Sequence, residues 1–178
     1  MQQTHTRSEK LSADTTVTAV FKSSLDRAFR TPMMGDASKI LIAFSMFPLV
    51  AGFAKDDTWG RVGGSRIPIV QGFLFFKARE MGFDQIFERE ENRYWKWGVS
   101  QFSAMLFFST ENCGEWWVTD NNDGTISVKW KYTWFSRNII THPLNWLFVK
   151  ILWRNVMKNG MANIKQMAEI ETPYIYNR

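Results

Sequence analysis

Glu80, Arg66 and Asp84 are the residues of this sequence that could supply acid–base chemistry. Glu80 ends the stretch LFFKARE (residues 74–80), whose alternation turns it toward the same face as its apolar neighbours. Arg66 lies in the preceding predicted strand and Asp84 in the following one. An inward pair of Arg66 and Glu80 could anchor a ligand carboxylate or polarise a carbonyl, but a glutamate at a strand end can equally lie in water. Both interpretations stay open.

Histidine and cysteine, the usual residues of metal sites and catalytic triads, are scarce. His5 and His142 are the only histidines, and Cys113 is the only cysteine. A disulfide framework is therefore excluded, and a zinc site or a serine–histidine triad is not expected. The sequence predicts no metal and no other cofactor. Tyr94 and Tyr132 complete the set of side chains that could donate a proton.

Aromatic residues are frequent, with 15 Phe, 9 Trp and 4 Tyr. Alternation over residues 126–135 places Ile126, Val128, Trp130, Tyr132 and Trp134 on one face of a strand. These rings either fill a core or line an apolar cavity, and we favour the cavity because large planar groups are hard to pack without gaps. The residues predicted to contact a ligand are Tyr94, Trp97, Phe107, Trp117, Trp130, Tyr132, Trp134, Phe148, Ile151 and Leu152.

A glycine-rich stretch, WGRVGGSRIPIV (residues 59–70), could in principle cradle a phosphate. Its spacing matches neither GxxxxGK[ST] nor GxGxxG, and the segment that follows is β-branched and contains Pro68. Without a helix N-terminus behind it, the loop lacks the aligned amides that attract phosphate. We therefore interpret Gly63 and Gly64 as a turn between two strands.

The elements that must position these residues begin with a strand at residues 15–21. Ser23 or Ser24 could cap a short helix that Thr31 and Pro32 should end, and a second apolar helical or irregular segment covers residues 38–47. The run DNNDG (residues 120–124) indicates a hairpin. Further strands are predicted at residues 54–59, 65–70, 73–81, 83–90, 93–99, 104–108, 115–120 and 125–135.

A long amphipathic helix should follow from Thr141-His142-Pro143 to Thr172-Pro173, with a bend at Gly160. Its predicted apolar stripe consists of Leu144, Leu147, Phe148, Ile151, Leu152, Val156, Ile164, Met167 and Ala168. Strands followed by one long helix define an α+β fold and exclude a doubly wound nucleotide fold. The expected packing is a curved antiparallel sheet wrapped around this helix.

Two tryptophans of this helix, Trp146 and Trp153, are seven residues apart and should share a face. With Lys150 and Arg154 beside them, they could contact an anionic membrane transiently. The alternatives are packing under the sheet and a homodimer contact.

The bulk properties describe one domain at residues 15–171 between polar tails at residues 1–14 and 172–178. The net charge is +5 with a pI near 9.4, but the basic residues are dispersed, so nucleic-acid binding is not predicted. The first fourteen residues lack the apolar core of a signal peptide. The apolar stretch at residues 40–53 contains Pro48 and is too short to span a membrane. We expect a cytoplasmic protein.

Several local patterns, in this order, resemble the START-related SRPBCC superfamily, in particular its polyketide-cyclase-like members. They are a strand followed by SSLDRAF, the segment MFPLVAGF before a tryptophan-bearing strand, the turn WGRVGGSR, and EREENRYWKW. The resemblance covers residues 15–171 and implies the helix-grip fold, with two short helices after the first strand. It also implies binding of a hydrophobic small molecule, such as a lipid, sterol-like or polyketide-like compound. The alternative is a cyclase or dehydratase that uses acid and base groups in the same cavity.

Overall fold

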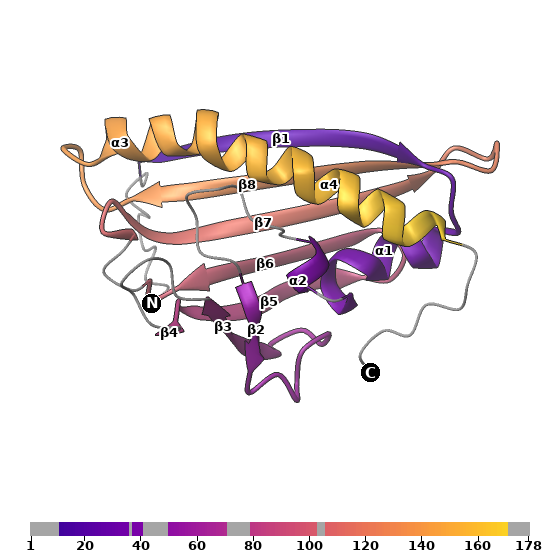
Figure 1. Ribbon diagram of the computed structural model, residues 1–178, viewed down its shortest axis with the longest axis horizontal. Coiled ribbons are helices and arrows are strands. Elements are labelled where there is room, and N and C mark those ends of the chain that lie inside the picture. The colour runs from indigo at the N-terminus through magenta and orange to yellow at the C-terminus, as the bar shows by residue number, and fades with distance from the viewer. Residues whose placement is uncertain (1–10, 36, 41–49, 71–78, 103–105, 171–178) are drawn as a thin grey trace, which may run out of the picture.

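A curved antiparallel sheet covered on one face by helices forms the body of the protein (Figure 1). The structure is a computed structural model that describes residues 11–35, 37–40, 50–70, 79–102 and 106–170. The strands are β1 (Ser12–Phe21), β2 (Val50–Ala54), β3 (Ser65–Val70), β4 (Arg79–Glu80), β5 (Phe83–Glu90), β6 (Tyr94–Ser100), β7 (Ser109–Asp120) and β8 (Ile126–Ser136). The helices are α1 (Leu25–Met34), α2 (Ala37–Ile40), α3 (His142–Leu147), the π-helical turn η2 (Phe148–Trp153) and α4 (Arg154–Glu169).

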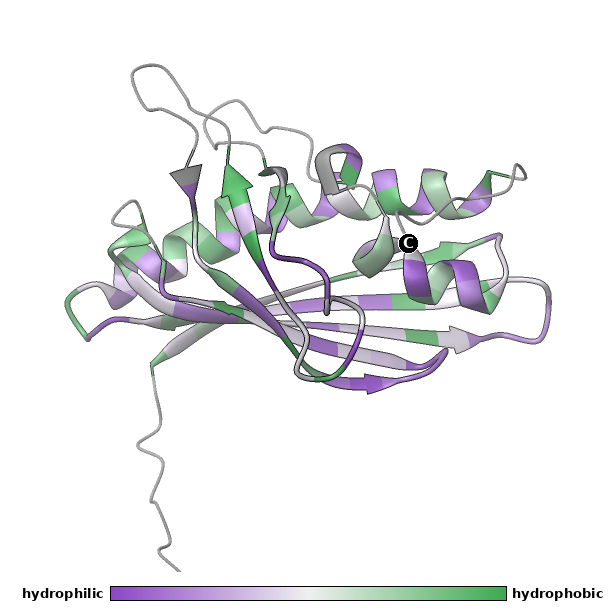
Figure 2. Ribbon diagram, turned by 90° about the horizontal axis from the view of Figure 1, so that it is seen from below, coloured by the Kyte–Doolittle hydropathy of each residue, from purple (hydrophilic) through white to green (hydrophobic). Residues whose placement is uncertain are grey.

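The strand order is β1-β8-β7-β6-β5-β3-β2, with β4 paired to β3. Hairpins join β5 to β6 and β7 to β8, and β1 pairs antiparallel with β8 along its whole length. Figure 2 shows the helices on the concave side of this sheet. The predicted α+β architecture, a curved antiparallel sheet around a long C-terminal helix, is therefore confirmed.

The concave, inner face carries the core. All five residues predicted to share a face of β8, from Ile126 to Trp134, are buried there. The register continues the pattern across the sheet, because Trp130 lies opposite Val17 on β1 and Trp116 on β7, and Trp116 lies opposite Trp95 on β6. The rings thus form a continuous inner layer beneath the helices.

Helix α1 begins as predicted, with the Ser24 hydroxyl accepting a hydrogen bond from the Arg27 amide at 3.3 Å. The prediction that Pro32 ends the helix is wrong, since α1 continues through it to Met34. Proline cannot donate to the carbonyl of Ala28 one turn back. The indole nitrogen of Trp116 donates to that carbonyl instead, at 3.2 Å, so the helix loses no buried hydrogen bond at its proline.

The C-terminal helix starts with Pro143 in its first turn and runs without a break to Glu169. Its irregularity lies at η2 and not at Gly160, which packs against Trp130: a Cβ there would stand 3.2 Å from the indole. In η2 the i→i+5 bonding gives the turn an extra residue and shifts the phase of the helix. Ile151 within η2, and Leu144 and Leu147 just before it, are exposed, although the straight α-helical stripe predicted them to face the sheet. The residues buried on this helix are Asn145, Phe148, Val149, Met157, Gly160, Met161, Ile164 and Ala168.

Several predicted boundaries differ from the structure. β1 begins within the predicted polar tail, and β7 begins earlier than residue 115. The predicted strand at 54–59 is replaced by β2 and a turn, where Lys55 and Gly60 have positive φ and the Trp59 indole donates to the Met33 carbonyl at 2.8 Å. Residues 106–108 form a turn instead of a strand. Residues 41–47, 73–78 and 104–105 of the predicted segments, and the predicted C-terminal tail at residues 172–178, lie outside the described residues.

The glycine pair lies in the loop that joins the antiparallel strands β2 and β3, as the turn interpretation predicted. Gly63 has φ +81°, and its amide donates to the Ile86 carbonyl. Gly64 packs so closely that a Cβ would stand 2.0 Å from the Thr58 carbonyl oxygen. The two glycines therefore allow the loop to pack closely on itself and against β5.

Candidate functional site

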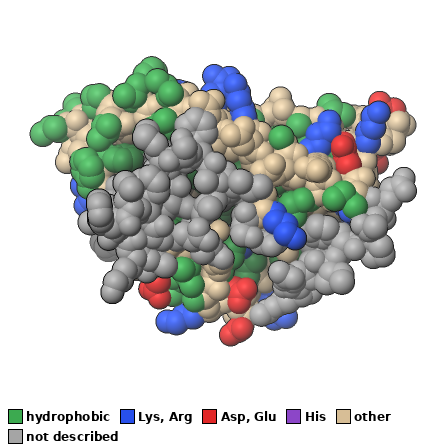
Figure 3. All heavy atoms as spheres, in the orientation of Figure 1, with side chains coloured by type: hydrophobic (Ala, Val, Ile, Leu, Met, Phe, Trp, Pro, Cys, Tyr) green, Lys and Arg blue, Asp and Glu red, His purple; other side chains and the backbone are tan. Residues whose placement is uncertain are grey.

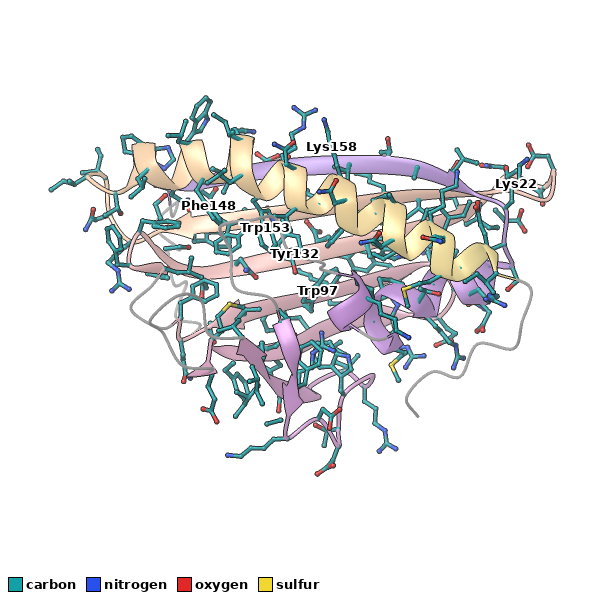
Figure 4. All side chains as sticks on the ribbon, viewed as in Figure 1. Lys22, Trp97, Tyr132, Phe148, Trp153 and Lys158 are labelled. Atoms are coloured by element: carbon teal, nitrogen blue, oxygen red, sulfur yellow. The ribbon has the colours of Figure 1, made fainter. Side chains whose placement is uncertain are left out.

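The candidate site is the aromatic layer between the inner face of the sheet and η2. Trp97 on β6, Tyr132 on β8, and Trp153 and Phe148 on η2 follow one another across this layer (Figure 4). The ring centroids of Trp97 and Tyr132 are 5.6 Å apart, and those of Tyr132 and Trp153 are 5.2 Å apart, both pairs edge to face. Phe148 continues the row at 6.1 Å from Trp153. Edge-to-face contacts of this kind fix the orientation of each ring.

Gly114 on β7 allows Trp97 to lie across the sheet. Gly114 stands between Trp97 and Tyr132 in the register, and a Cβ at this position would come within 2.5 Å of the indole. Because that space is empty, the Trp97 indole reaches over β7 and donates to the Tyr132 hydroxyl at 2.9 Å. The glycine therefore sets the position of the polar group at the centre of the site.

At one end of the inner face, the indole N–H groups have protein acceptors. Trp95 donates to the Phe29 carbonyl at 3.0 Å, and Trp116 donates to Ala28, both on α1. With Trp59 and Trp97, four of the nine tryptophans donate to protein atoms in this way. Beneath α1, the aromatic layer is thus a satisfied structural core.

The rest of the same face differs. The indole nitrogens of Trp130, Trp134 and Trp153 are buried, and none of them has a hydrogen-bond partner among the described residues. The residues Trp130 and Trp134 are only 4% and 2% exposed. The rings adjoin one another, with centroids of Trp134 and Trp153 at 5.0 Å and of Trp130 and Tyr132 at 5.8 Å. Native proteins rarely leave such donors unpaired, so these three N–H groups require an acceptor from outside the described residues.

Tyr132 adds a fourth donor. Its hydroxyl oxygen accepts from Trp97, and its own O–H has no acceptor among the described residues. Burial raises the pKa of Tyr132, and the Asp84 carboxylate nearby raises it further. The phenol therefore stays protonated at neutral pH and can donate a hydrogen bond, but it is no base.

A buried ion pair lies at the edge of this layer. The Arg66 Nε donates to Asp84 Oδ2 at 2.9 Å, and the two side chains are 11% and 4% exposed. The Arg66 guanidinium also lies 3.5 Å from the ring centroids of Phe53 and Trp59. Burial raises the pKa of Asp84, and Arg66 only partly opposes this effect. Burial likewise lowers the pKa of Arg66, against the attraction of Asp84.

The second carboxylate oxygen of Asp84, Oδ1, is buried and accepts no hydrogen bond within normal geometry from the described residues. Arg66 is thus paired with Asp84 and not with Glu80, because the register places Arg66 directly opposite Asp84. Glu80 pairs with Ile69 in the sheet, and its side chain is exposed. This agrees with the second interpretation, in which a glutamate at the strand end lies in water.

Four of the predicted ligand-contacting residues lie away from the inner layer. Tyr94 and Trp117 are on the convex face, where their rings contact each other at 5.2 Å and Tyr94 donates to Glu115. They alternate with Trp95 and Trp116, which occupy the inner face in their place. Phe107 lies exposed in a turn, and the phase shift at η2 turns Ile151 outward. The structure does bring together Trp97, Trp130, Tyr132, Trp134, Phe148 and Leu152 on the inner side.

Trp153 and Phe102 also belong to the site and were not among the predicted residues. Trp153 was expected to share a face with Trp146, but it contacts the rings of Tyr132, Trp134 and Phe148, whereas Trp146 is half exposed. Phe102 stacks on Trp134 at 5.3 Å. Its sequence signal is weak, because Phe102 follows β6 in irregular backbone.

Metal chemistry finds no support in the described part of the chain, which contains no group of three or more His, Cys, Asp or Glu side chains able to hold an ion. No helix among the described residues is long and apolar enough to cross a membrane.

Comparisons with known proteins place the fold. The sequence matches no family model and no curated protein. Solved structures similar to this chain include protein CV1439 from Chromobacterium violaceum (TM-score 0.65, 9% identity, covering 89% of this chain and 98% of that one) and ginseng major latex-like protein 151 from Panax ginseng (TM-score 0.60, 13% identity, 89% and 98%). Another is the di-domain ARO/CYC StfQ from the steffimycin biosynthetic pathway, with TM-score 0.65, 12% identity, and 89% of this chain matched to 51% of that chain.

The sheet, its terminal helix and these neighbours define a helix-grip protein. This is the fold that the resemblance of the sequence patterns implied.

Proposed function

We propose that this protein binds a hydrophobic small molecule between the inner face of the sheet and η2, and that the molecule carries oxygen acceptors. The observation that carries the proposal is the set of three buried, unpaired indole N–H groups of Trp130, Trp134 and Trp153. The Tyr132 hydroxyl, held protonated beside them, is a fourth donor. The site offers several donors surrounded by aromatic rings, so the complementary ligand is apolar and bears carbonyl, ether or ester oxygens.

The free-energy cost of unpaired buried donors favours a bound ligand. Each buried donor left unpaired costs about 1–3 kcal/mol, and a ligand acceptor would recover that cost. Apolar area removed from water adds about 25 cal/mol per Å² before the cost of ordering is subtracted. The ARO/CYC StfQ, which comes from a biosynthetic pathway, has a similar fold, and this likeness supports a polyketide-like compound as the ligand. A lipid or sterol-like compound with similar oxygens is equally compatible with the donors.

The first test is to purify the protein under native conditions, extract it with organic solvent, and identify the extract by mass spectrometry. A stoichiometric, oxygen-bearing apolar compound is the expected result. An empty extract, together with no change in melting temperature across a panel of lipids, sterols and aromatic polyketides, would contradict the proposal.

A pair of substitutions then tests the donors themselves. Trp134→Phe keeps a ring but removes the N–H, and should weaken binding by about 2- to 12-fold, the equivalent of one hydrogen bond. Trp117→Phe makes the same chemical change on the convex face and should leave affinity unchanged. Equal affinities for both variants would show that the unpaired indole does not meet the ligand.

A cyclase or dehydratase is the second candidate, favoured by one observation. Asp84 has an unpaired buried carboxylate oxygen and a raised pKa, as a general acid or base near neutral pH requires. If the site is catalytic, Asp84→Asn should bind a poly-β-carbonyl substrate but no longer convert it. Unchanged conversion would leave Asp84 a structural partner of Arg66.

A further inference from the structure

The start of the C-terminal helix carries an exposed apolar surface that the ligand site does not use. The turn between β8 and α3 presents Ile139 and Ile140, which are 74% and 85% exposed. On the helix that follows, Leu144, Trp146, Leu147 and Ile151 are each close to half exposed. Figure 3 shows hydrophobic side chains gathered over α3 at this end of the molecule. We call these six residues the apical patch.

The turn that carries Ile139 and Ile140 is held in place by hydrogen bonds between backbone amides and side chains. The Asn138 amide donates to the Thr141 hydroxyl at 3.2 Å, and the Thr141 amide donates to the Asn138 side-chain oxygen at 2.9 Å. These two bonds close the turn with both isoleucines on the outside. Phe107, also exposed, is tied to the same end because Arg137 donates to its carbonyl at 2.7 Å. The apolar surface is therefore preformed and does not depend on an opening of the fold.

The stretch of chain that carries the patch has basic side chains and no acidic ones. Between Asp123 and Glu169 the sequence contains no acidic residue, but it contains seven basic ones: Lys129, Lys131, Arg137, Lys150, Arg154, Lys158 and Lys165. Arg154 and Lys158 are exposed, and they are four residues apart on α4, so they share its outer side just beyond Ile151. Figure 4 shows Lys158 on this helix.

Lys150 is the basic residue beside the patch that is already engaged. It donates to the Asp14 carbonyl at 2.5 Å and lies 4.0 Å from the Asp14 carboxylate. Arg154 and Lys158 are therefore the cations best placed to meet a negatively charged surface next to the apical patch.

From this juxtaposition we infer that the apical patch docks on an anionic lipid surface, with the isoleucine turn and Trp146 entering the headgroup layer. Exposed isoleucines, a tryptophan and flanking Lys/Arg form the pattern of an interfacial membrane contact. A second copy of the chain, docked patch to patch, would bring Arg154 and Lys158 of the two copies close together, and this repulsion is unfavourable. The inference does not depend on the proposed ligand, because its residues face away from the aromatic layer.

The test is co-sedimentation of the full chain with vesicles of phosphatidylcholine alone and of phosphatidylcholine with phosphatidylserine. Binding should require phosphatidylserine and weaken as salt is raised. I139S/I140S should reduce partitioning by about tenfold or more, since it removes two buried aliphatic side chains from the contact. R154E/K158E should reduce it by a similar factor, because each basic residue near such a surface contributes about fivefold.

Matched controls separate the patch from general effects. V20S/V62S removes two exposed β-branched residues elsewhere, and K22E/R61E reverses two exposed charges elsewhere; both should bind like the wild type apart from a small effect of net charge. Absence of vesicle binding, or equal losses in patch and control variants, would overturn the inference. So would a wild-type dimer in sedimentation velocity that I139S/I140S converts to a monomer without any vesicle binding, which would identify the patch as a homodimer contact.

Discussion

Replacing Gly114 by alanine should disturb the centre of the aromatic layer. The added Cβ would stand 2.5 Å from two atoms of the Trp97 indole and 3.0 Å from its nitrogen. The indole cannot stay where it is, because real Cβ atoms do not approach ring carbons so closely. It must rotate or shift, and it then loses the 2.9 Å hydrogen bond to Tyr132.

The cost follows from two contributions. Overpacking a core position costs about 1–3 kcal/mol, and the lost hydrogen bond adds about 1 kcal/mol. Gly114→Ala should therefore lower the free energy of unfolding by about 2–4 kcal/mol. For a domain of this size, this corresponds to a fall in melting temperature of about 4–16 °C.

Thermal and urea unfolding followed by circular dichroism would measure this change. The matched control is Gly52→Ala, where a Cβ meets no atom within 4 Å and the φ angle is not positive. That variant should be neutral or more stable by up to about 1 kcal/mol, because alanine has less backbone entropy to lose.

A double-mutant cycle with Trp97→Phe tests the cause. Without the larger ring of the indole and its N–H, residue 114 has room for a Cβ and no hydrogen bond to break. Gly114→Ala should then cost about as little as Gly52→Ala, which gives a coupling of about 2–4 kcal/mol. Additive effects, or a Gly114→Ala variant as stable as the wild type, would refute the reasoning.

Three further predictions concern other parts of the fold. Trp116→Phe should lower the free energy of unfolding by about 1–3 kcal/mol in urea, because it leaves the Ala28 carbonyl of α1 unpaired. In a Pro32→Ala background the restored amide can donate to that carbonyl, so the same substitution should cost less. Asp84→Asn should destabilise the protein by about 3–5 kcal/mol in the same assay by leaving Arg66 buried without a counter-charge, and replacing both residues by apolar ones should recover most of the loss. Burial raises the pKa of the Cys113 thiol to about 11, so its alkylation rate in the native protein should rise only toward that pH, whereas the guanidinium-unfolded chain should react near its ordinary pKa.

The sign of the thiol effect on stability is also fixed. A group whose pKa is raised by folding stabilises the native state below its unfolded pKa and loses that contribution as the pH rises through its folded value. The wild type should therefore lose stability relative to Cys113→Ser as the pH rises toward about 11. A constant difference between the two proteins would show that the thiol is not desolvated.

Features that depend on neighbours in the sequence could be predicted. Alternation along residues 126–135 identified the buried face of β8 correctly because successive strand side chains point to opposite faces. The same argument, applied to the pairs Tyr94-Trp95 and Trp116-Trp117, could not decide which ring faces inward, since both members are aromatic. Only the register across β6, β7 and β8 decides this.

Features that depend on distant partners could not be predicted. Helix α1 continues through Pro32 because Trp116, far along the chain, donates to the carbonyl that the proline cannot serve. Arg66 pairs with Asp84 through the register of β3 with β5. The inward position of Trp153 follows from the π-helical turn, whose extra residue no periodicity of apolar side chains revealed.

The pairing of the first strand with the last also has a consequence for biosynthesis. Phe21 of β1 lies opposite Ile126 of β8, so about a hundred residues must be made between the two partners. At about 5–20 residues per second, the N-terminal strand waits on the order of 5–20 s for its neighbour, and contacts so distant in sequence also form slowly after release. For that time the β-branched segment TTVTAV has a free edge that other nascent chains can join. We expect the yield of native protein to depend on how well the cell shields this one strand until β8 has been made.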